Sequence, residues 1–458
     1  MTVTTAAEPR TYEGTLDGGG RYVVKVPAGW NGTLLTYTHH YRYPGTPCPA
    51  ILVPSDNELG PRMDGAVIER LLLARGYALA GTADSVGWMM ADTLRDQVLL
   101  LDWFAETVGT PERTYAWGTS PGGLAAQTLV QLFPRRFDGG LSLGADASGV
   151  LNQMNLRLDA GYAVKTLLGP DSGLQLGRMT ADPEANVNIA LGLIMGGASG
   201  DPRSGARLLL AGAVANMVPV NDSHATELPD DLNEAVKTQA WMLAMSHSGV
   251  TYGAARKNIE ERAGGNPMWN TGVDYRELYA RSTMKTLVEK AYAAAGADLS
   301  ADLDILNAGE RIEADPAASR YLIRTGGFPG LTPVPVVTMH TTLDGAAPVE
   351  HERAYADRVA IVGTPANLRQ LFVARGFTCT FSPADVITAF DVLRERVETG
   401  SWGDTSPDTL NSVAGAYSAE ERRVFNFSKP IDEPNRYEVM DPAFVSYQPA
   451  ELPRNFPF

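Results

Sequence analysis

Short β-rich segments alternate with amphipathic helical segments in two separate stretches of the chain, and this alternation constrains the fold most strongly. Before residue 150 the β-rich segments are Arg21–Val26, Thr33–Thr38, Tyr77–Ala80, Thr114–Trp117 and Leu141–Leu143. After residue 318 the pattern returns with Val334–Met339 and Leu368–Val373, each followed by a helical segment. Strands that alternate with helices form a mostly parallel sheet with helices on both faces, so the sequence predicts an α/β fold.

The stretch between these two parts is dominated by helical patterns and is interrupted by turns such as Gly264–Pro267. We therefore predict four parts. Residues 1–149 form the first part of the α/β core, residues 150–318 form a helical cap inserted between two strands, and residues 319–400 complete the core. Residues 401–458 are rich in proline and aromatic residues, which predicts an extended tail packed on the core, because disordered tails contain few aromatic residues.

Composition excludes several classes of protein. A formal net charge of −15 argues against a nucleic-acid or anionic-membrane partner, because phosphate groups need a basic surface. The longest mostly apolar stretch, Leu208–Val220, is shorter than the roughly 18–20 residues that cross a bilayer. No positively charged region followed by an apolar region is visible at the N-terminus, so a cytoplasmic location is expected.

Two cysteines, Cys48 and Cys379, are too few for a disulfide scaffold or a four-cysteine metal site. We expect both to be reduced, although a disulfide between them remains an alternative.

The segment Tyr115–Gly123 contains the pattern Gly-x-Ser-x-Gly around Ser120, between a β-rich segment and a helical segment. In this context the glycines allow a tight, strained turn that exposes the serine hydroxyl at the edge of the sheet, which is a nucleophile elbow. The alternative is an ordinary glycine- and serine-rich turn. We predict that Ser120 is a nucleophile.

Several segments resemble bacterial α/β-hydrolases of the capped serine esterase and peptidase type. They are Trp30–Leu34 with the following His39, the Ser120 turn, Gly264–Gly272, His340–Gly345 and Arg375–Phe381, in the family's order. The resemblance covers nearly the whole chain and implies an α/β-hydrolase fold. It also implies that Asp344 is the acid of the catalytic triad, since the superfamily's order is serine, acid, histidine. Asp146 is a weaker candidate for the acid, and a simple Asp-Gly turn is the alternative for Asp344.

Three departures from the family pattern fall at the expected reacting centre. Thr378 stands where the resemblance places the catalytic histidine, and threonine cannot act as a base near neutral pH. Pro121 follows Ser120, so the backbone N–H that normally binds the oxyanion is missing, although proline also suits the first turn of a helix. His40 replaces the glycine of the family's His-Gly pair, either as a relocated base or as a residue that fills the pocket.

The expected catalytic residues are therefore Ser120 as the nucleophile, Asp344 as the acid and His40 as the most available base. The substrate-binding and oxyanion region is expected to contain His39, Tyr41, Thr119, Pro121 and Thr378. No zinc-protease helix, Walker loop or dinucleotide-binding loop occurs, so no metal and no cofactor is expected. The expected partner is a small-molecule substrate.

The leading hypothesis is an atypical serine hydrolase that acts on a carbonyl, ester or lactone-bearing small molecule, by hydrolysis or acyl transfer through Ser120. Because the base and one oxyanion donor are both altered, an alternative is a non-hydrolytic cyclase, lyase or epimerase of a specialised biosynthetic pathway. A catalytically inactive binding protein with the same fold is the third hypothesis. The sequence does not identify the substrate.

Overall fold

A mixed β-sheet forms the centre of the computed structural model, which describes residues 8–54, 63–83, 86–327, 330–430, 432–433 and 435–454, without the side chains of residues 246–248. Within the described residues the sheet has nine strands in the order β1-β2-β4-β3-β5-β6-β7-β8-β11. Their bounds are β1 (Arg10–Thr15), β2 (Arg21–Val26), β3 (Thr33–Thr38), β4 (Ala78–Thr82), β5 (Arg113–Thr119), β6 (Gly139–Leu143), β7 (Val336–Leu343), β8 (Leu368–Gly376) and β11 (Phe444–Val445).

Strands β3 to β8 run parallel to one another, whereas β2 pairs antiparallel with β4 and with β1, and β11 pairs antiparallel with β8. In this register Thr38 of β3 pairs with Gly118 of β5, and Thr119 pairs with Leu143 of β6. The carboxyl ends of the central strands therefore meet at one edge, which is where ligands bind in open parallel sheets.

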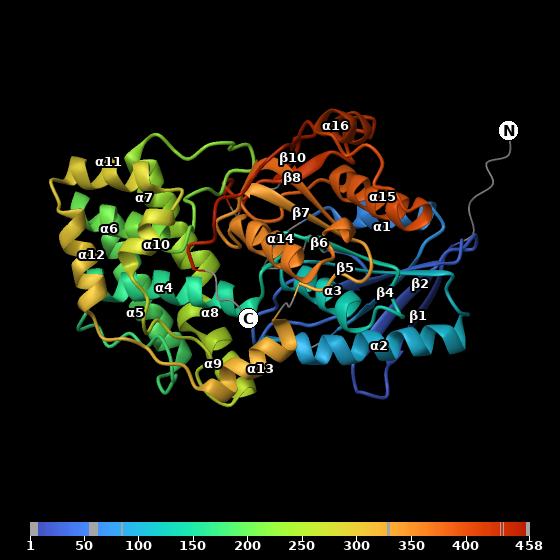
Figure 1. Cartoon of the computed structure of the whole chain (residues 1–458), viewed down its shortest axis with the longest axis horizontal. Helices are drawn as coiled ribbons and strands as arrows, with labels where there is room; N and C mark the ends of the chain where they lie inside the picture. Colours follow the sequence, from blue (N-terminus) through green and yellow to red (C-terminus); the bar gives the residue numbers. More distant parts are fainter. Residues whose placement is uncertain are drawn as a thin grey trace.

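Helices cover both faces of the sheet (Figure 1). Alternate strand residues face opposite sides. In β3, Leu35 packs in one apolar cluster with residues of α1 (Gly65–Ala74) and α15 (Pro383–Thr399). Its neighbour Leu34 packs in another cluster with residues of α2 (Met90–Thr107) and α3 (Pro121–Leu132). This arrangement confirms the predicted α/β fold with helices on both faces.

The chain between β6 and β7 is helical throughout its described secondary structure. Its elements are α4 (Val150–Leu168), α5 (Pro183–Ser199), α6 (Pro202–Ala213), α7 (Leu232–Trp241), the π-helix η1 (Met242–His247), α8 (Ser248–Tyr252), α9 (Ala254–Ala263), α10 (Tyr275–Arg281), α11 (Lys285–Ala295), α12 (Leu299–Ala308) and α13 (Pro316–Gly326). We call residues 150–326 the helical lobe. Helix α13 runs across the predicted boundary at residue 318, because the Gly and Pro signals that end it come later in the sequence.

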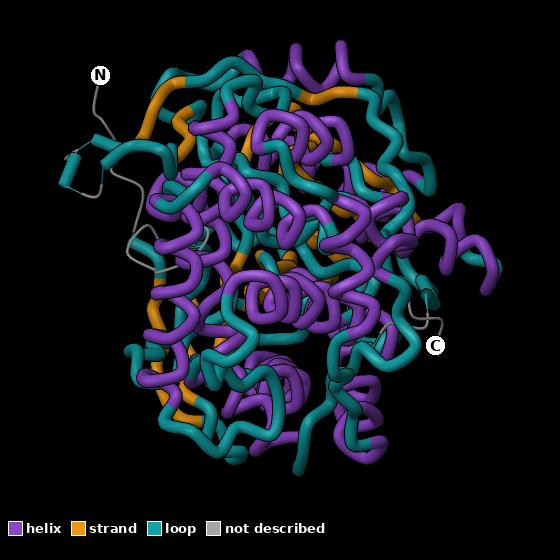
Figure 2. The backbone as a smooth tube through the Cα atoms, turned by 90° about the vertical axis from the view of Figure 1, so that its left-hand side faces the viewer, coloured by secondary structure: helices purple, strands orange, loops and turns teal. Residues whose placement is uncertain are grey.

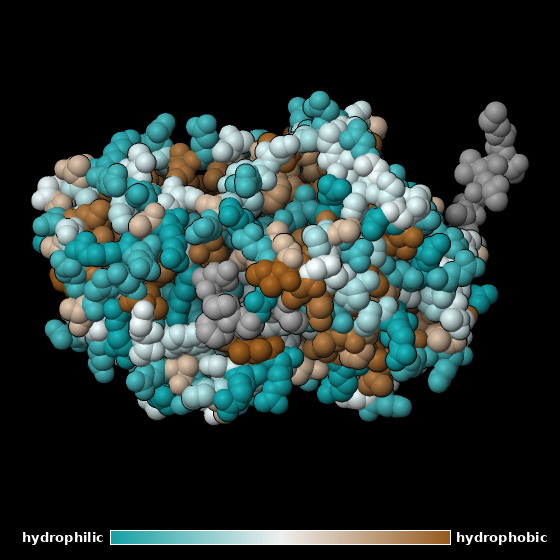
Figure 3. All heavy atoms as spheres, viewed as in Figure 1, coloured by the Kyte–Doolittle hydropathy of each residue, from teal (hydrophilic) through white to brown (hydrophobic). Residues whose placement is uncertain are grey.

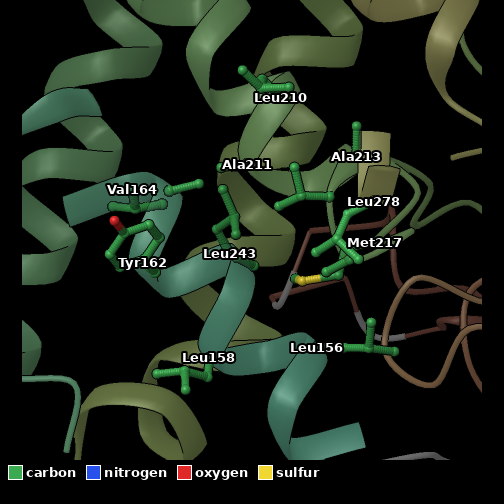
Figure 4. Packing of buried hydrophobic residues seen from close by; sticks show 14 of the residues in the cluster. Leu156, Leu158, Tyr162, Val164, Leu210, Ala211, Ala213, Met217, Leu243 and Leu278 are labelled. Atoms are coloured by element: carbon green, nitrogen blue, oxygen red, sulfur yellow. The ribbon is translucent and has the colours of Figure 1, made fainter. Parts of the chain in front are cut away.

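The helical lobe contains a large apolar cluster. Val164 of α4, Leu210 of α6 and Leu243 of η1 are buried in it and are among the side chains drawn in Figure 4. Most helices of the lobe lie to one side of the sheet in Figure 1, and Figure 2 shows them in front of the strands. The same apolar cluster includes Met90 of α2 and Leu124 of α3, so the lobe packs directly against helices that cover the sheet.

The C-terminal segment is more structured than the extended tail that the sequence predicts. It contains α16 (Pro407–Gly415), a hairpin of β9 (Arg423–Phe425) and β10 (Tyr437–Val439), and β11, which extends the central sheet beside β8. Strands of two or three residues are too short to give a periodic pattern, so the sequence does not reveal them.

No helix in the described parts of the chain is long and apolar enough to cross a membrane. The face of the molecule in Figure 3 is mostly hydrophilic, with separate small hydrophobic areas.

A buried ion pair fixes the loop that follows β8. The Arg375 guanidinium donates to the Asp385 carboxylate over 2.5 Å and to the Thr380 carbonyl over 3.1 Å. Asp385 also forms a capping box with Ser382 at the start of α15. Both charged side chains are buried, so the loop between them, which contains Thr378, is held at both ends.

We expect Asp385→Ala to lower the free energy of unfolding by about 3–5 kcal/mol, because it leaves a buried guanidinium without its counter-ion. Chemical denaturation measures the change. Arg70→Ala is the matched control, because Arg70 pairs with Glu420 at the surface, and its loss should cost less than about 1 kcal/mol. Equal effects of the two substitutions would contradict this account of the loop.

Candidate active site

Ser120 lies in the tight turn between β5 and α3, at the edge where the central strands end. Its backbone has φ 56° and ψ −127°, a conformation that non-glycine residues rarely adopt. The Ser120 N–H donates to the Leu143 carbonyl over 2.8 Å, and the Ser120 carbonyl accepts from Gly123 and Leu124 at the start of α3. The predicted strand-to-helix turn is confirmed, and its strain is the kind found where a side chain must be presented for chemistry.

Two glycines make this turn possible. A Cβ atom on Gly118 would lie 2.3 Å from the carbonyl oxygen of Gly122, and one on Gly122 would lie 2.1 Å from the carbonyl oxygen of Thr38. Such distances are far below van der Waals contact, so only glycine fits at either position. The Gly-x-Ser-x-Gly pattern thus reflects the close approach of β3, β5 and α3.

A cavity of about 520 Å³ opens at Ser120, between the strand ends and the helical lobe. Its described lining residues are His40, Tyr41, Tyr43, Trp88, Ser120, Pro121, Asp146, Met154, Arg157, Asn221, Trp241, Met245, Val250, Ala346, Ala347, Phe377, Thr378, Phe427, Ser428, Lys429, Pro430 and Arg436. They come from the loops after β3, β4, β5, β6, β7 and β8, from the helical lobe, and from the C-terminal segment. The cavity is large enough for a small-molecule substrate.

Five of the eight predicted site residues line this cavity: His40, Tyr41, Ser120, Pro121 and Thr378. The other three, His39, Thr119 and Asp344, are buried next to it and are not among its described lining residues.

His39 and Thr119 make contacts behind the cavity wall. The His39 ring lies 2.5 Å from the carbonyl oxygen of His40, and the Thr119 hydroxyl lies 3.0 Å from that of Tyr37. The two residues therefore lie in the layer of buried side chains behind the cavity lining. Tyr41 packs edge to face against Tyr43, and burial raises the pKa of its phenol, so it presents a neutral ring to the cavity.

Asp344 follows β7 and has a histidine neighbour on its own strand. One carboxylate oxygen accepts the N–H groups of Ala346 and Ala347, each over 2.8 Å, and the other lies 3.4 Å from Nε2 of His340. His340 also contacts Glu352, over 3.1 Å. Burial alone would lower the pKa of His340, but the hydrogen bonds and charges of Asp344 and Glu352 raise this pKa to about 10.

Thr378 lies in a strained loop after β8. Phe377 and Cys379 on either side of it have φ values of 65° and 52°. The Phe377 N–H donates to the carbonyl oxygen of Leu343 over 2.9 Å, which holds the loop beside Asp344. The position expected for a catalytic histidine is therefore at the cavity wall, and threonine occupies it.

The two cysteines do not pair with each other. No disulfide joins them, and the Cys379 thiol packs under the loop after β6, 3.7 Å from the carbonyl oxygen of Leu143.

Asp146, after β6, is the acidic side chain among the described lining residues. Burial raises its pKa to about 6, the charge of Arg157 opposes this shift, and the charge of Asp344 adds to it. From the sequence Asp146 is a weaker candidate than Asp344. The sequence does not reveal that Asp146 faces the cavity, because this depends on how the loops pack.

Sequence reasoning missed the contributions of the helical lobe and the C-terminal segment. Arg157 of α4 enters the cavity wall, where burial lowers its pKa. Phe377 lies 5.3 Å from Trp241 and 4.4 Å from Phe427 between ring centroids. We call Trp241, Phe377 and Phe427 the aromatic wall. The abundance of aromatic residues after residue 401 is the one sequence signal that indicates this aromatic wall.

The described residues contain no group of three or more His, Cys, Asp or Glu side chains arranged to hold a metal ion.

The sequence is 28% identical over 429 residues to the o-phthalyl amidase of Xanthobacter agilis, a match that covers 88% of this chain and 90% of that protein. The structure is similar to feruloyl esterase B from Aspergillus oryzae, with a TM-score of 0.40, 15% identity, and coverage of 88% of this chain and 85% of that chain. For another esterase from Aspergillus oryzae the TM-score is 0.39, the identity 14%, and the coverage 85% and 80%. No protein-family model matches the chain.

The parallel strands β3 to β8, the antiparallel β2 and the serine turn after β5 make up the α/β-hydrolase fold that the motifs predict.

We expect His340 to stabilise the folded protein in a pH-dependent way. The pKa of its imidazole rises from the ordinary 6.5 to about 10 in the folded state, so its stabilisation is complete below pH 6.5 and lost as the pH rises through 10. The melting temperature of His340→Gln should lie well below that of the parent protein at pH 6. The difference between the two melting temperatures should shrink toward pH 10. The exposed His224 provides the control substitution, His224→Gln. A gap that stays constant with pH would rule out this ion pairing.

Proposed function

We propose that the protein is a hydrolase that cleaves an ester or amide bond of a small aromatic substrate, with Ser120 as its nucleophile. The observation that carries this proposal is the strained strand-to-helix turn that presents Ser120 at the wall of a cavity of about 520 Å³. The o-phthalyl amidase relative supports it, because that match extends over 88% of the chain. The same relative gives no support to the non-hydrolytic alternative.

The chemistry follows from the position of the hydroxyl. The Ser120 oxygen attacks the carbonyl carbon of the substrate while its proton passes to a base, and the amine or alcohol leaves with a proton. Water then attacks the acyl-enzyme and releases the acid. His40 and Asp146 both line the cavity and are the candidate proton acceptors of this step. Asp344 stays the predicted acid of the site, with His340 as its imidazole neighbour.

The substrate class follows from the cavity wall. The aromatic wall gives flat apolar surfaces beside Ser120, and aromatic rings pack well against such surfaces. The name of the amidase relative also contains an aromatic acyl group. We therefore propose an aromatic acyl group as the part of the substrate that the cavity holds.

Pro121 makes the oxyanion site unusual. It occupies the first position of α3 and has no N–H, so the stabilisation of the tetrahedral intermediate depends on other donors. Losing one such donor costs on the order of 10²–10³ in rate in a protease. We propose that this protein works on activated esters or amides at modest rates.

Ser120→Ala should abolish hydrolysis of an aryl benzoate ester, with a loss of about 10³-fold or more, because the acyl-enzyme cannot form. A fluorophosphonate probe should label the parent protein at Ser120, as detected by peptide mass spectrometry. Ser199→Ala, on the exposed surface of the helical lobe, is the matched control and should keep both activity and labelling. If Ser120→Ala retains most of the activity, Ser120 is not the nucleophile and the non-hydrolytic hypothesis gains support.

The aromatic wall should decide substrate preference. Phe427→Leu is expected to lower kcat/KM for a benzoyl ester by about fivefold relative to an acetyl ester, which corresponds to the ~1 kcal/mol of one aromatic pair. Steady-state kinetics on both esters measure this ratio. Trp402→Leu, whose ring contacts Arg369 and Arg396 instead, is the control. An unchanged ratio would show that the acyl group lies elsewhere.

A further inference from the structure

We propose that the Asp146 carboxylate is the general base that accepts the proton of Ser120, in place of the histidine that Thr378 replaces. This inference rests on the proposed function, because it assigns the proton acceptor of that same reaction. It departs from the sequence-based expectation, in which His40 is the base.

The first support is position. Strands β5 and β6 are neighbours, and the Ser120 N–H donates to the carbonyl oxygen of Leu143 at the end of β6 over 2.8 Å. Asp146 follows in the loop directly after this contact, and both side chains line the same cavity. A Cβ on Gly144 would lie 2.3 Å from the Cys379 thiol, so the loop that carries Asp146 also packs tightly against the loop that carries Thr378.

The second support is the difference between Asp146 and the buried carboxylates near it. Asp344 accepts two backbone N–H groups and lies beside His340. Glu352 accepts hydrogen bonds from Thr338 and Gln370. In contrast, no hydrogen bond from any described residue reaches the Asp146 carboxylate. Its acceptor capacity is therefore available to a substrate, a water molecule or the Ser120 hydroxyl.

The third support is the electrostatic environment. Burial raises the pKa of Asp146 to about 6, even though Arg157 from α4 opposes the shift. Asp344, in the loop after β7, raises this pKa further, and His340 of β7 lowers it. A base with a pKa near 6 is mostly ionised at neutral pH and still binds a proton far better than an ordinary aspartate, which is the compromise that general base catalysis needs.

The reaction balances with Asp146 as a proton carrier. The O–H bond of Ser120 breaks, its proton binds the Asp146 carboxylate, and the serine oxygen forms a bond to the carbonyl carbon, whose π electron pair moves to the carbonyl oxygen. When that pair returns, the bond to the leaving nitrogen or oxygen breaks, and the leaving group takes the proton from Asp146. Water then repeats the sequence: its proton passes to Asp146 and its oxygen bonds to the acyl carbon. The bond between the acyl carbon and the Ser120 oxygen breaks, and the Ser120 oxygen takes the proton from Asp146.

The test compares Asp146→Asn with His40→Gln in an assay with a neutral aryl benzoate ester. The kcat/KM of the parent protein should rise with pH as a group with a pKa of about 6 loses its proton. We call this rise the limb near pH 6. Asp146→Asn should lose about 10²–10⁴-fold in kcat and lose this limb, since asparagine cannot accept a proton. It should also lose fluorophosphonate labelling of Ser120. His40→Gln should keep the limb, and Asp357→Asn, on the exposed face of α14 (Glu350–Val362), should behave as the parent protein.

Thermal unfolding gives a second readout that a merely structural role would not produce. Because the pKa of Asp146 is raised in the folded state, ionising it destabilises the protein increasingly above its ordinary value of 3.8 and up to about 6. Asp146→Asn should therefore raise the Tm at pH 8 more than at pH 4. A structural carboxylate would instead stabilise the protein when ionised, and its loss would lower the Tm at pH 8.

The base assignment is overturned if Asp146→Asn keeps activity within about threefold, or if the limb disappears in His40→Gln and stays in Asp146→Asn. If Asp146→Asn does not fold, Asp146→Glu, which keeps the charge, should retain the limb at a reduced kcat; an unchanged kcat overturns the assignment. Ser120→Ala separates the two proposals. If Ser120→Ala is inactive and Asp146→Asn is active, the proposed hydrolase function stands and only the assignment of the base is wrong. If Ser120→Ala is active, the proposed function itself is wrong.

Discussion

The turn at Ser120 exists only because the backbones of β3, β5 and α3 approach each other more closely than side chains allow. The positions of Gly118 and Gly122 have no space for a Cβ, since carbonyl oxygens already occupy it. This contact forces the positive φ of Ser120 and fixes where α3 begins. It also places the loops after β5 and β6 side by side, because Ser120 bonds to the last residue of β6. The cavity, its carboxylate and its aromatic wall are all arranged around this point.

Charge is distributed around the cavity in two different ways. Beneath the wall, His340 carries a positive charge that Asp344 and Glu352 balance, and each carboxylate also accepts other hydrogen bonds. The positive charge of His340 is thus shared between two buried carboxylates, and one oxygen of Asp344 has only this ion pair as a partner. At the wall, burial raises the pKa of Asp146 to about 6, although the charge of Arg157 opposes this shift. A buried carboxylate kept at a cost in stability is typical of a functional group.

The sequence predicts the core well and the cavity only in part. Strand β3 has the predicted bounds, and Asp64 caps α1 as its N-cap residue type suggests, because periodicity and capping are local properties. Ser120 was also predictable, since the glycines that it needs are adjacent in sequence. Arg157 and Phe427 were not, because they reach the cavity from the helical lobe and the C-terminal segment. Their approach depends on long-range packing that leaves no local pattern.

The ranking of the two acids shows the same limit. Asp344 lies in the sequence motif that predicts the acid, whereas Asp146 lies buried at the cavity wall. The basicity of a carboxylate depends on its surroundings and not on the motif around it. Burial of Asp146 requires the helical lobe, because α4 contributes Met154 and Arg157 to the wall opposite the strand ends. Without that layer water would solvate the carboxylate, its pKa would fall toward the ordinary 3.8, and it would be a much weaker base. In the proposed mechanism the lobe therefore has a chemical role: by excluding water it raises the proton affinity of Asp146, which would act where this fold usually has a histidine.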